Sequence, residues 1–170
     1  MNLNLGCGEQ YAPGWVNVDH EGSPHRRDQT VDLTGELPWP QDTVDAVYAG
    51  HLLEHLTLDE CRGLLVRLRT CVKPAGMIMV VGPDVEVAAR MERDGATLEV
   101  PLDQLRFGAG RWLGDVHRWE CTLAGLTVLL IESGWSKVTH FGIDEVGAFW
   151  PVAFRGPRWQ VAVRAEVPVT

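Results

Sequence analysis

The sequence predicts an α/β fold, with a mostly parallel sheet that carries an antiparallel strand at its C-terminal edge. Short apolar strand signals alternate with helical patterns along the chain, which is typical of a parallel sheet with crossover helices. The run Met77–Val81 is continuously apolar, as expected for a central parallel strand buried on both faces. Two strand signals lie close together near the C-terminus, which indicates an antiparallel pair there.

The first connection of the sheet is predicted to be unusually short. The opening strand signal, Leu3–Leu5, leads into the turn Gly6–Gly8, and the next signal, Trp15–Val18, ends at Asp19. About ten residues lie between the turn and Asp19, which is too few for a full crossover helix with its loops. We therefore expect an abbreviated first crossover helix, of a turn or so at most.

Two further strands and the clearest helix follow. The strands are expected at Val31–Leu33 and Val44–Ala49. Thr57 and Glu60 have the spacing of a capping box, and apolar residues then recur at helical intervals. The segment Lys73–Gly76 is expected to end this helix.

The helices, strands and loops of the second half of the chain are predicted from its glycines, prolines and apolar runs. A helical pattern spans Asp84–Asp94, and Thr122 is expected to cap a leucine-rich helix. The late strands are expected near Val138–Gly142 and Trp159–Ala165. We predict one domain over residues 1–170, with a glycine-rich lid or substrate segment at 95–117 and an insertion near 144–157.

Composition and charge restrict the class of protein. A chain of 170 residues fits one domain, and its net charge of −8 disfavours a duplex nucleic-acid partner, because binding phosphates requires clustered Lys and Arg. No apolar run is long enough to span a bilayer. The four cysteines form no Cys-x-x-Cys pair, so a zinc ribbon is not expected. No signal peptide is evident, and with reduced thiols we expect a cytoplasmic protein.

The glycine turn suits a nucleoside better than a dinucleotide. A bare Gly-x-Gly fits any tight turn between a strand and a loop. The third glycine of the dinucleotide fingerprint is replaced by Tyr11, and no full helix is available to hold a pyrophosphate. Asp19 ends the second strand, where its carboxylate can accept hydrogen bonds from both hydroxyls of a ribose.

A series of short motifs carries a family resemblance. It comprises Leu3–Gly8, Gly14–Asp19, Asp32-Leu33, Leu37–Pro40, Val44–Tyr48, His51–His55, Val72–Gly76 and Gly82–Asp84. In this order the motifs resemble class I (Rossmann-like) S-adenosylmethionine (SAM)-dependent methyltransferases, especially a small group known as predicted SAM-dependent methyltransferases. The resemblance covers roughly the first half of the chain. It departs from the family at Ala75, where a glycine is usual, and at Gly82, where an apolar residue is commoner.

The resemblance implies SAM as the cofactor and a set of residues to bind it. In this set the turn would underlie the methionine and ribose parts, Asp19 would bind the ribose hydroxyls, and His20 would lie against the adenine. Asp32 would meet the amino group of the adenine and Leu33 its face, and the residues after the fourth strand would face the sulfonium. The complete set is Leu5, Gly6, Cys7, Gly8, Asp19, His20, Asp32, Leu33, Ala49 and His51.

Two histidines are candidates for catalysis. Methyl transfer from a sulfonium is an in-line displacement, so the protein mainly aligns the acceptor and excludes water. A general base is needed only when the acceptor carries a proton that must leave. His51 is expected to border the methyl group as this base, or else to pack on the adenosine. His117 is expected either to supply a base from the lid or to anchor the lid on the sheet.

A metal-binding interpretation of the same segment is less favoured. His51-x-x-Glu54-His55 resembles the Glu-x-x-Glu-His metal motif of certain RNA 2′-O-methyltransferases and ubiquinone-pathway O-methyltransferases, with His117 as a fourth ligand. The first ligand here is His rather than Glu. The favoured interpretation is that Glu54 and His55 order the start of a helix. No metal is therefore expected, and these two residues are the candidates if one binds.

The predicted function is transfer of a methyl group to an oxygen or nitrogen of a small-molecule or glycan acceptor. Three alternatives stay open: other chemistry in the same site, such as aminopropyl transfer; a non-catalytic SAM-binding partner subunit; and a metal-using O-methyltransferase that acts on RNA or another macromolecule. The aromatic residues Trp112, Trp119, Phe149 and Trp150 are candidates for lining an acceptor pocket, although a place in the core or at an interface is the favoured interpretation. Pairing with a second copy of the chain, to give a homodimer, also stays open.

Overall fold

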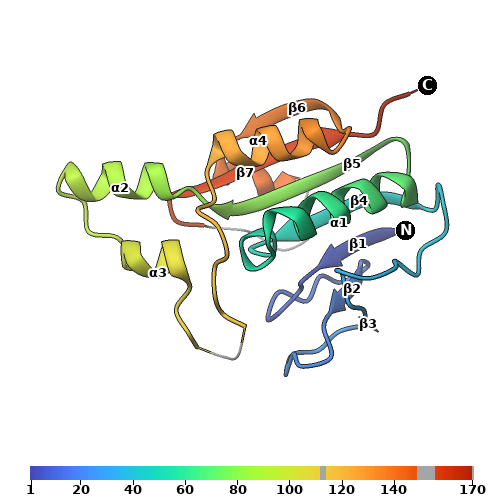
Figure 1. Ribbon diagram of the computed structural model, residues 1–170, viewed down its shortest axis with the longest axis horizontal. Coiled ribbons are helices and arrows are strands. Elements are labelled where there is room, and N and C mark those ends of the chain that lie inside the picture. Colours follow the sequence, from blue (N-terminus) through green and yellow to red (C-terminus); the bar gives the residue numbers. More distant parts are fainter. Residues whose placement is uncertain (112–113, 149–155, 170) are drawn as a thin grey trace.

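A seven-stranded sheet organises the part of the chain that the computed structural model describes, residues 1–111, 114–148 and 156–169. The strand order is β3-β2-β1-β4-β5-β7-β6 (Figure 1). The bounds are β1 (Asn2–Leu5), β2 (Val16–Asp19), β3 (Gln29–Thr30), β4 (Val44–Gly50), β5 (Val72–Pro83), β6 (Ser136–Phe141) and β7 (Gln160–Glu166).

The direction of the strands confirms the predicted fold class. The pairs from β3 to β5 are parallel, and β7 is antiparallel to both β5 and β6. The two late strands pair as expected. However, β7 lies between β5 and β6, so the outermost strand of this end is β6.

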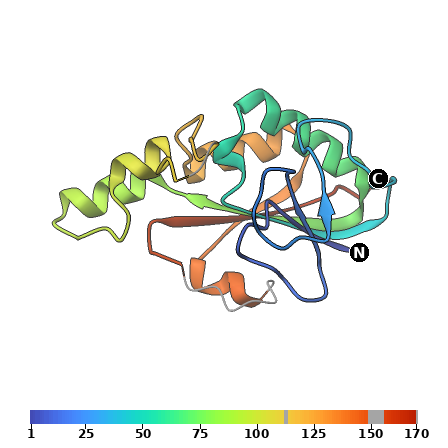
Figure 2. The same ribbon diagram turned by 90° about the horizontal axis from the view of Figure 1, so that it is seen from below.

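Four helices and two 3₁₀ turns accompany the strands in the described residues. They are α1 (Leu58–Cys71), α2 (Val85–Arg93), α3 (Leu102–Phe107), α4 (Leu123–Glu132), η1 (Leu53–His55) and η2 (Ile143–Ala148). Helices α1 and α4 lie side by side on one face of the sheet, and η2 lies on the other (Figures 1 and 2). Helices α2 and α3 extend beyond the end of β5. None of the described helices has both the length and the apolar character needed to cross a membrane.

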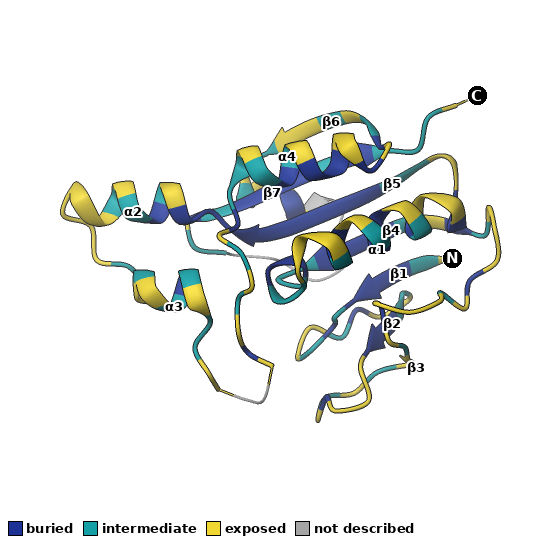
Figure 3. Cartoon of the chain, viewed as in Figure 1, coloured by how far each residue is buried: buried dark blue, intermediate teal, exposed yellow. Residues whose placement is uncertain are grey.

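The main hydrophobic core lies between the sheet and the α1–α4 layer. Buried side chains of the central strands meet those of both helices, including Leu3, Leu5, Val47, Ile78, Leu64, Leu65, Leu68, Leu126 and Leu130. The opposite face has a smaller cluster, made of Ala12, Tyr48, Met79, Val81, Val146 and Ala162. The central strands are accordingly buried along most of their length, while the helices expose their outer sides (Figure 3). In the part of the chain that the structure describes, loops and η2 cover the second face.

The connection between β1 and β2 contains no helix, as its length predicts. Two asparagine side chains hold it instead. Asn4 Nδ2 donates to the carbonyl of Gln10 (2.7 Å) and to Asn17 Oδ1 (2.9 Å). Asn17 Oδ1 accepts from the amide of Ala12 (2.7 Å), and Asn17 Nδ2 donates to the carbonyls of Ala12 and Trp15. The buried backbone groups of the loop are thus satisfied by side chains where a helix would have satisfied them internally.

Several helix signals in the sequence are confirmed. Thr57 and Glu60 form the predicted capping box, and Thr122 accepts from the amide of Gly125 (3.0 Å) at the start of α4. Helix α2 matches the segment predicted to be helical. Helix α1 ends at Cys71, and β5 begins at once and runs to Pro83, so this strand is longer than the apolar run that predicted it.

The third strand lies two residues earlier than predicted. Gln29 and Thr30 pair with Val18 and Asp19, whereas the prediction was Val31–Leu33. The chain turns at Asp32, whose carboxylate accepts from the amide of Thr34 (2.9 Å). Leu33 enters the core from this turn, so its apolar character reflects burial outside a strand.

The two segments predicted as lid and insertion are described in part. Helix α3 lies within 95–117, and most of η2 lies within 144–157. Trp112, Phe149 and Trp150 lie outside the described residues, so their predicted place in a pocket or interface stays a prediction.

We predict that Asn17→Ala lowers the free energy of unfolding by about 3 kcal/mol, because it leaves buried backbone groups of the loop without partners. Urea denaturation followed by circular dichroism measures the change. Asn2→Ala is the matched control on β1, where the side chain makes no hydrogen bond to the described residues, and it should change stability by less than about 0.5 kcal/mol. Equal effects of the two substitutions would contradict the role given to Asn17.

Candidate functional site

The carboxyl ends of β1 and β2 bring the glycine turn and Asp19 together. The amide of Gly8 donates to Asp19 Oδ2 (2.9 Å), which also accepts from Ser23 Oγ (2.9 Å). Asp19 Oδ1 accepts from the amide of His20 (2.8 Å). The turn requires glycine because Gly6 and Gly8 have φ angles of +61° and +47°. Asp19 therefore ties the loop after β1 to the loop after β2.

This arrangement fits a nucleoside cofactor. A Cβ atom at Gly8 would meet nothing within 4 Å, so the loop faces open space there, whereas at Gly6 it would lie 2.9 Å from Leu52 Cδ1. A carboxylate offers about four lone-pair positions, and three protein donors bind that of Asp19. One position is left for a ribose hydroxyl.

The other predicted cofactor residues divide into buried and accessible groups. The side chains of Leu5, Cys7, Leu33 and Ala49 are buried, so a ligand would meet them mainly through their backbone. Those of His20, Asp32 and His51 reach solvent at least in part. The carboxylate of Asp32 accepts from Thr34 Oγ1 (2.7 Å), and the ring of His20 lies 3.9 Å from Asp19 Oδ1.

His51 and Glu54 form a hydrogen-bonded pair at the end of β4. His51 Nδ1 lies 2.9 Å from Glu54 Oε1, and the backbone of His51 is held at φ +51°. The side chain of His51 is 37% exposed and that of Glu54 only 1%. An ionised carboxylate can only accept, so Nδ1 carries the proton and Nε2 keeps a free lone pair. A base held by a buried carboxylate in this way is oriented for proton transfer.

The charge of Glu54 is stabilised despite complete burial. Burial raises the pKa of this carboxyl group, but the hydrogen bond from His51 and the proximity of both His51 and His55 outweigh it. The pKa of Glu54 therefore lies below its ordinary value. This keeps Glu54 ionised near neutral pH, as the orientation of His51 requires.

His117 binds helix α3 and lies beside His55. Its Nδ1 is 2.8 Å from the carbonyl oxygen of Leu105, and its amide donates to the carbonyl of Phe107 (3.1 Å). The His55 and His117 rings stand edge to face at 4.9 Å. Burial lowers the pKa of His55. The hydrogen bonds hold His117 on α3, within its own segment, and the ring contact brings it beside η1. His51 does not join the group formed by Glu54, His55 and His117.

Trp159 is a neighbour of His51 that the sequence did not predict. The two ring centroids are 6.5 Å apart in an edge-to-face arrangement. Trp159 is 4% exposed, donates from Nε1 to Glu99 (3.0 Å), and packs with Val85 and Leu105 of helices α2 and α3. It thereby connects the α2–α3 lobe to the end of β4. More than a hundred residues separate Trp159 from His51, so no local pattern signals this contact.

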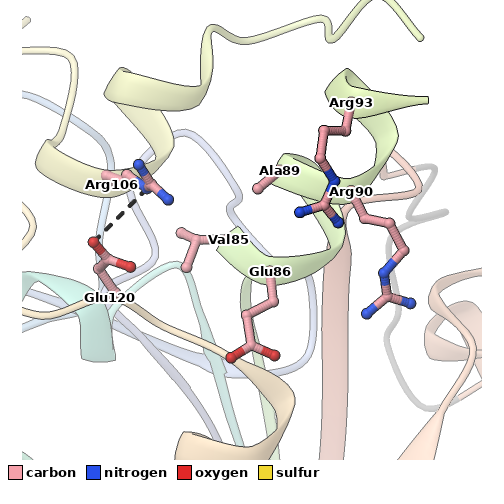
Figure 4. Close-up of a pocket in the computed structure, with 7 residues that line it drawn as sticks. All are labelled: Val85, Glu86, Ala89, Arg90, Arg93, Arg106 and Glu120. Carbon is pink, nitrogen blue, oxygen red and sulfur yellow. Dashed lines mark ion pairs between the residues drawn. The ribbon is translucent and has the colours of Figure 1, made fainter. Parts of the chain in front are cut away.

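A separate hollow of about 280 Å³ lies between α2 and α3 (Figure 4). Its walls carry charges of both signs, from Glu86, Arg90, Arg93, Arg106 and Glu120. Arg106 Nε lies 3.7 Å from Glu120 Oε1, and Arg90 and Arg93 project from α2 (Figure 4). None of the predicted cofactor residues lines this hollow, so it is distinct from the site at the ends of β1, β2 and β4.

Comparison with solved structures gives the fold of the chain. It is similar to a SAM-dependent methyltransferase from Archaeoglobus fulgidus, at 16% identity and a TM-score of 0.61, over 97% of this chain and 85% of that one. It is also similar to the SAM-dependent methyltransferase SibL in its apo form, at 16% identity and a TM-score of 0.61, over 99% of this chain and 50% of that one. A third similar structure is human N-acetylserotonin methyltransferase in complex with SAM, at 18% identity and a TM-score of 0.59, over 99% of this chain and 47% of that one.

These likenesses extend over nearly the whole chain, which has the fold of class I, Rossmann-like SAM-dependent methyltransferases. The chain spans about half the length of SibL and of the human enzyme. No protein-family model matches the sequence, and no curated protein matches it.

We predict that the cysteines of the native protein resist alkylation. All four are free and buried, and burial raises the pKa of Cys7 to about 11 and that of Cys61 to about 12. Because the thiolate is the nucleophile, iodoacetamide at pH 8 should react at least about 100-fold more slowly with the native chain than in urea, as followed by mass spectrometry. Rapid modification of native Cys7 would show that the glycine turn opens readily.

Proposed function

We propose that this chain, which has the class I methyltransferase fold, transfers a methyl group from SAM to an oxygen or nitrogen atom of a small-molecule or glycan acceptor. The observation that carries the proposal is the convergence of three features at one edge of the sheet: the glycine turn, Asp19, and the His51–Glu54 pair. Ligands of open α/β sheets bind at the carboxyl ends of the strands, where these residues lie.

In this proposal the residues at the ends of β1, β2 and β3 bind the cofactor. The turn Gly6–Gly8 supplies a close backbone surface, and Asp19 accepts from a ribose hydroxyl. His20 and Asp32 lie toward the adenine. Ala49 and His51 border the reacting methyl group. When bound, SAM supplies an activated methyl group on a sulfonium.

The contribution of His51 is to accept a proton at Nε2. Glu54 fixes the ring by holding Nδ1 at 2.9 Å, which leaves Nε2 with the free lone pair. As the acceptor oxygen or nitrogen attacks in line, its proton passes to Nε2, and the buried carboxylate stabilises the imidazolium that forms. The ring of Trp159 stands edge to face with that of His51 at a centroid distance of 6.5 Å, so it borders one side of the imidazole.

The charge of the chain supports a small or uncharged acceptor. A net charge of −8 disfavours a long polyanion, because counterion release requires many lysine and arginine contacts. The α2–α3 lobe reaches His51 through Trp159, so an acceptor at His51 would lie beside this lobe.

We predict that the wild-type protein binds SAM but not NAD in calorimetry, and that Asp19→Ala weakens SAM binding roughly 10- to 100-fold, as expected for loss of a hydrogen bond to a charged group. Asp94→Ala, which removes a carboxylate at the end of α2, is the control and should bind SAM like the wild type. Thermal unfolding of each variant tests whether the loop fold survives. A wild-type chain that does not bind SAM, or an Asp19→Ala variant with undiminished affinity, would overturn the proposal.

We predict that His51→Ala lowers kcat by about 10²- to 10⁴-fold while SAM affinity changes little, because a base acts only in the chemical step. The assay follows release of S-adenosylhomocysteine with an acceptor found by screening hydroxyl- and amine-bearing small molecules and glycans. Glu54→Gln should show a smaller loss of kcat, and His140→Ala, an exposed histidine on β6, should show none. If His51→Ala weakens SAM binding and kcat equally, His51 packs on the cofactor instead.

A further inference from the structure

A group of three side chains beside the proposed base has the chemistry of a metal site. One ligand atom each from Glu54, His55 and His117 lies within 4.8 Å of the other two. Among the described residues this is the one such group of histidine, cysteine and acidic side chains. Glu54 and His55 come from η1, whereas His117 comes from the segment after α3, so the group joins two separate parts of the chain.

The hydrogen bonds around His117 leave one of its nitrogens free for a ligand. Its Nδ1 lies 2.8 Å from the carbonyl oxygen of Leu105. A carbonyl only accepts, so Nδ1 must carry the proton, and Nε2 keeps its lone pair. Metal-binding histidines in proteins are held in this manner, with the second nitrogen donating to a carbonyl or carboxylate.

His55 has a buried nitrogen that the described protein does not satisfy. Its Nδ1 has no hydrogen-bond partner among the described residues. Burying a polar atom in this way costs free energy unless a ligand, an ion or a water binds it. On the neighbouring segment the carboxylate oxygen Asp115 Oδ1 is also buried and has no hydrogen-bond partner in the described part of the chain, while Oδ2 accepts from the amide and Nε of Arg111.

Glu54 can bind a cation and still hold His51. The bond from His51 uses one lone-pair position of a carboxylate that has about four. The side chain is only 1% exposed, so its carboxylate oxygens face a setting of low dielectric constant. An adjacent cation would offset part of the cost of burying this charge.

We propose that Glu54, His55 and His117 form a binding site for one divalent cation of the zinc type. Two imidazole nitrogens and one carboxylate oxygen are a ligand set typical of zinc, and they leave a coordination position open for water or another ligand. Ligands of a tetrahedral zinc ion lie about 3.3 Å apart at bond lengths of roughly 2.0–2.1 Å, so the three side chains must draw slightly closer as the ion binds. The bound ion would join η1 to the segment after α3.

Zinc binding by the full chain tests this proposal without any methyl-transfer assay. The protein is stripped with a chelator, dialysed, and titrated with Zn²⁺ and, separately, with Mg²⁺ in a calorimeter. We expect one Zn²⁺ per chain, a rise in Tm in its presence, and no comparable binding of Mg²⁺, which prefers oxygen ligands. A wild-type chain that takes up no Zn²⁺, or one that binds only Mg²⁺, overturns the proposal.

Single substitutions identify the ligands. His55→Ala and His117→Ala should each weaken Zn²⁺ binding by at least about 100-fold, since even the loss of an outer-shell partner costs roughly 10- to 100-fold. His117→Gln is tested in parallel because it can retain a hydrogen bond to Leu105 and so separates ligation from anchoring. His140→Ala is the matched control and should bind Zn²⁺ like the wild type. Undiminished binding by the His55 and His117 variants, or equal loss in His140→Ala, would place the ion elsewhere.

The outcome is independent of the proposed function. Zn²⁺ titrations use the chain without SAM, and SAM titrations use the metal-free chain. A protein that binds Zn²⁺ but not SAM would overturn the methyltransferase proposal and support the metal site, and the reverse result would do the opposite.

Discussion

The short connection between β1 and β2 is the constraint on which the site depends. Parallel neighbours are normally joined through a helix that satisfies its own backbone and covers the sheet. Here a loop performs the connection, and the side chain of Asn17 supplies donors and an acceptor to it from a fully buried position. The loop can then stay short, so the turn at Gly8 lies within hydrogen-bonding distance of Asp19 (2.9 Å). Because no helix joins β1 to β2, the described residues on one face of the sheet are mainly those of loops and η2.

Glu54 is the second point at which several parts of the chain meet. Its carboxylate holds His51, its backbone carbonyl accepts from the amide of Arg118 (2.8 Å), and a carboxylate oxygen lies near His55 and His117. A buried ionised side chain contributes little to stability on balance, because desolvation offsets the attraction to its partners. Its value here lies in fixing the orientation of neighbouring rings, which an apolar side chain of the same volume would leave undefined.

The sequence was sufficient to predict the features that depend on local patterns. The alternation of strands and helices, the capping box at Thr57 and the missing first helix all follow from short-range spacing. The limits of β3 could not be predicted in this way. Leu33 has the apolar character of a strand residue, but it lies in a turn from which its side chain enters the core. The sequence also did not predict that β7 lies between β5 and β6. Antiparallel pairing of the two late strands leaves open which of them pairs with β5.

The candidate site could also be predicted only in part. The glycine turn and Asp19 lie at ends of adjacent strands that are close in the sequence, and the structure brings them together. The contacts of His51 with Trp159 and of His117 with Leu105 depend on how α2 and α3 fold back, which is a tertiary property. The sequence favoured a helix-start role for Glu54 and His55, and no local pattern distinguishes that role from the burial of a charged side chain.

The position of β7 has a consequence for the protein during its synthesis. Strands β5 and β6 become neighbours only through β7, and β7 is made after both of them. A nascent chain that ends before Gln160 therefore carries unpaired backbone groups on β5 and on both edges of β6. Exposed strand edges of this kind recruit other chains into aggregates. A nascent chain of this length therefore exposes more unpaired strand edge than the finished sheet does.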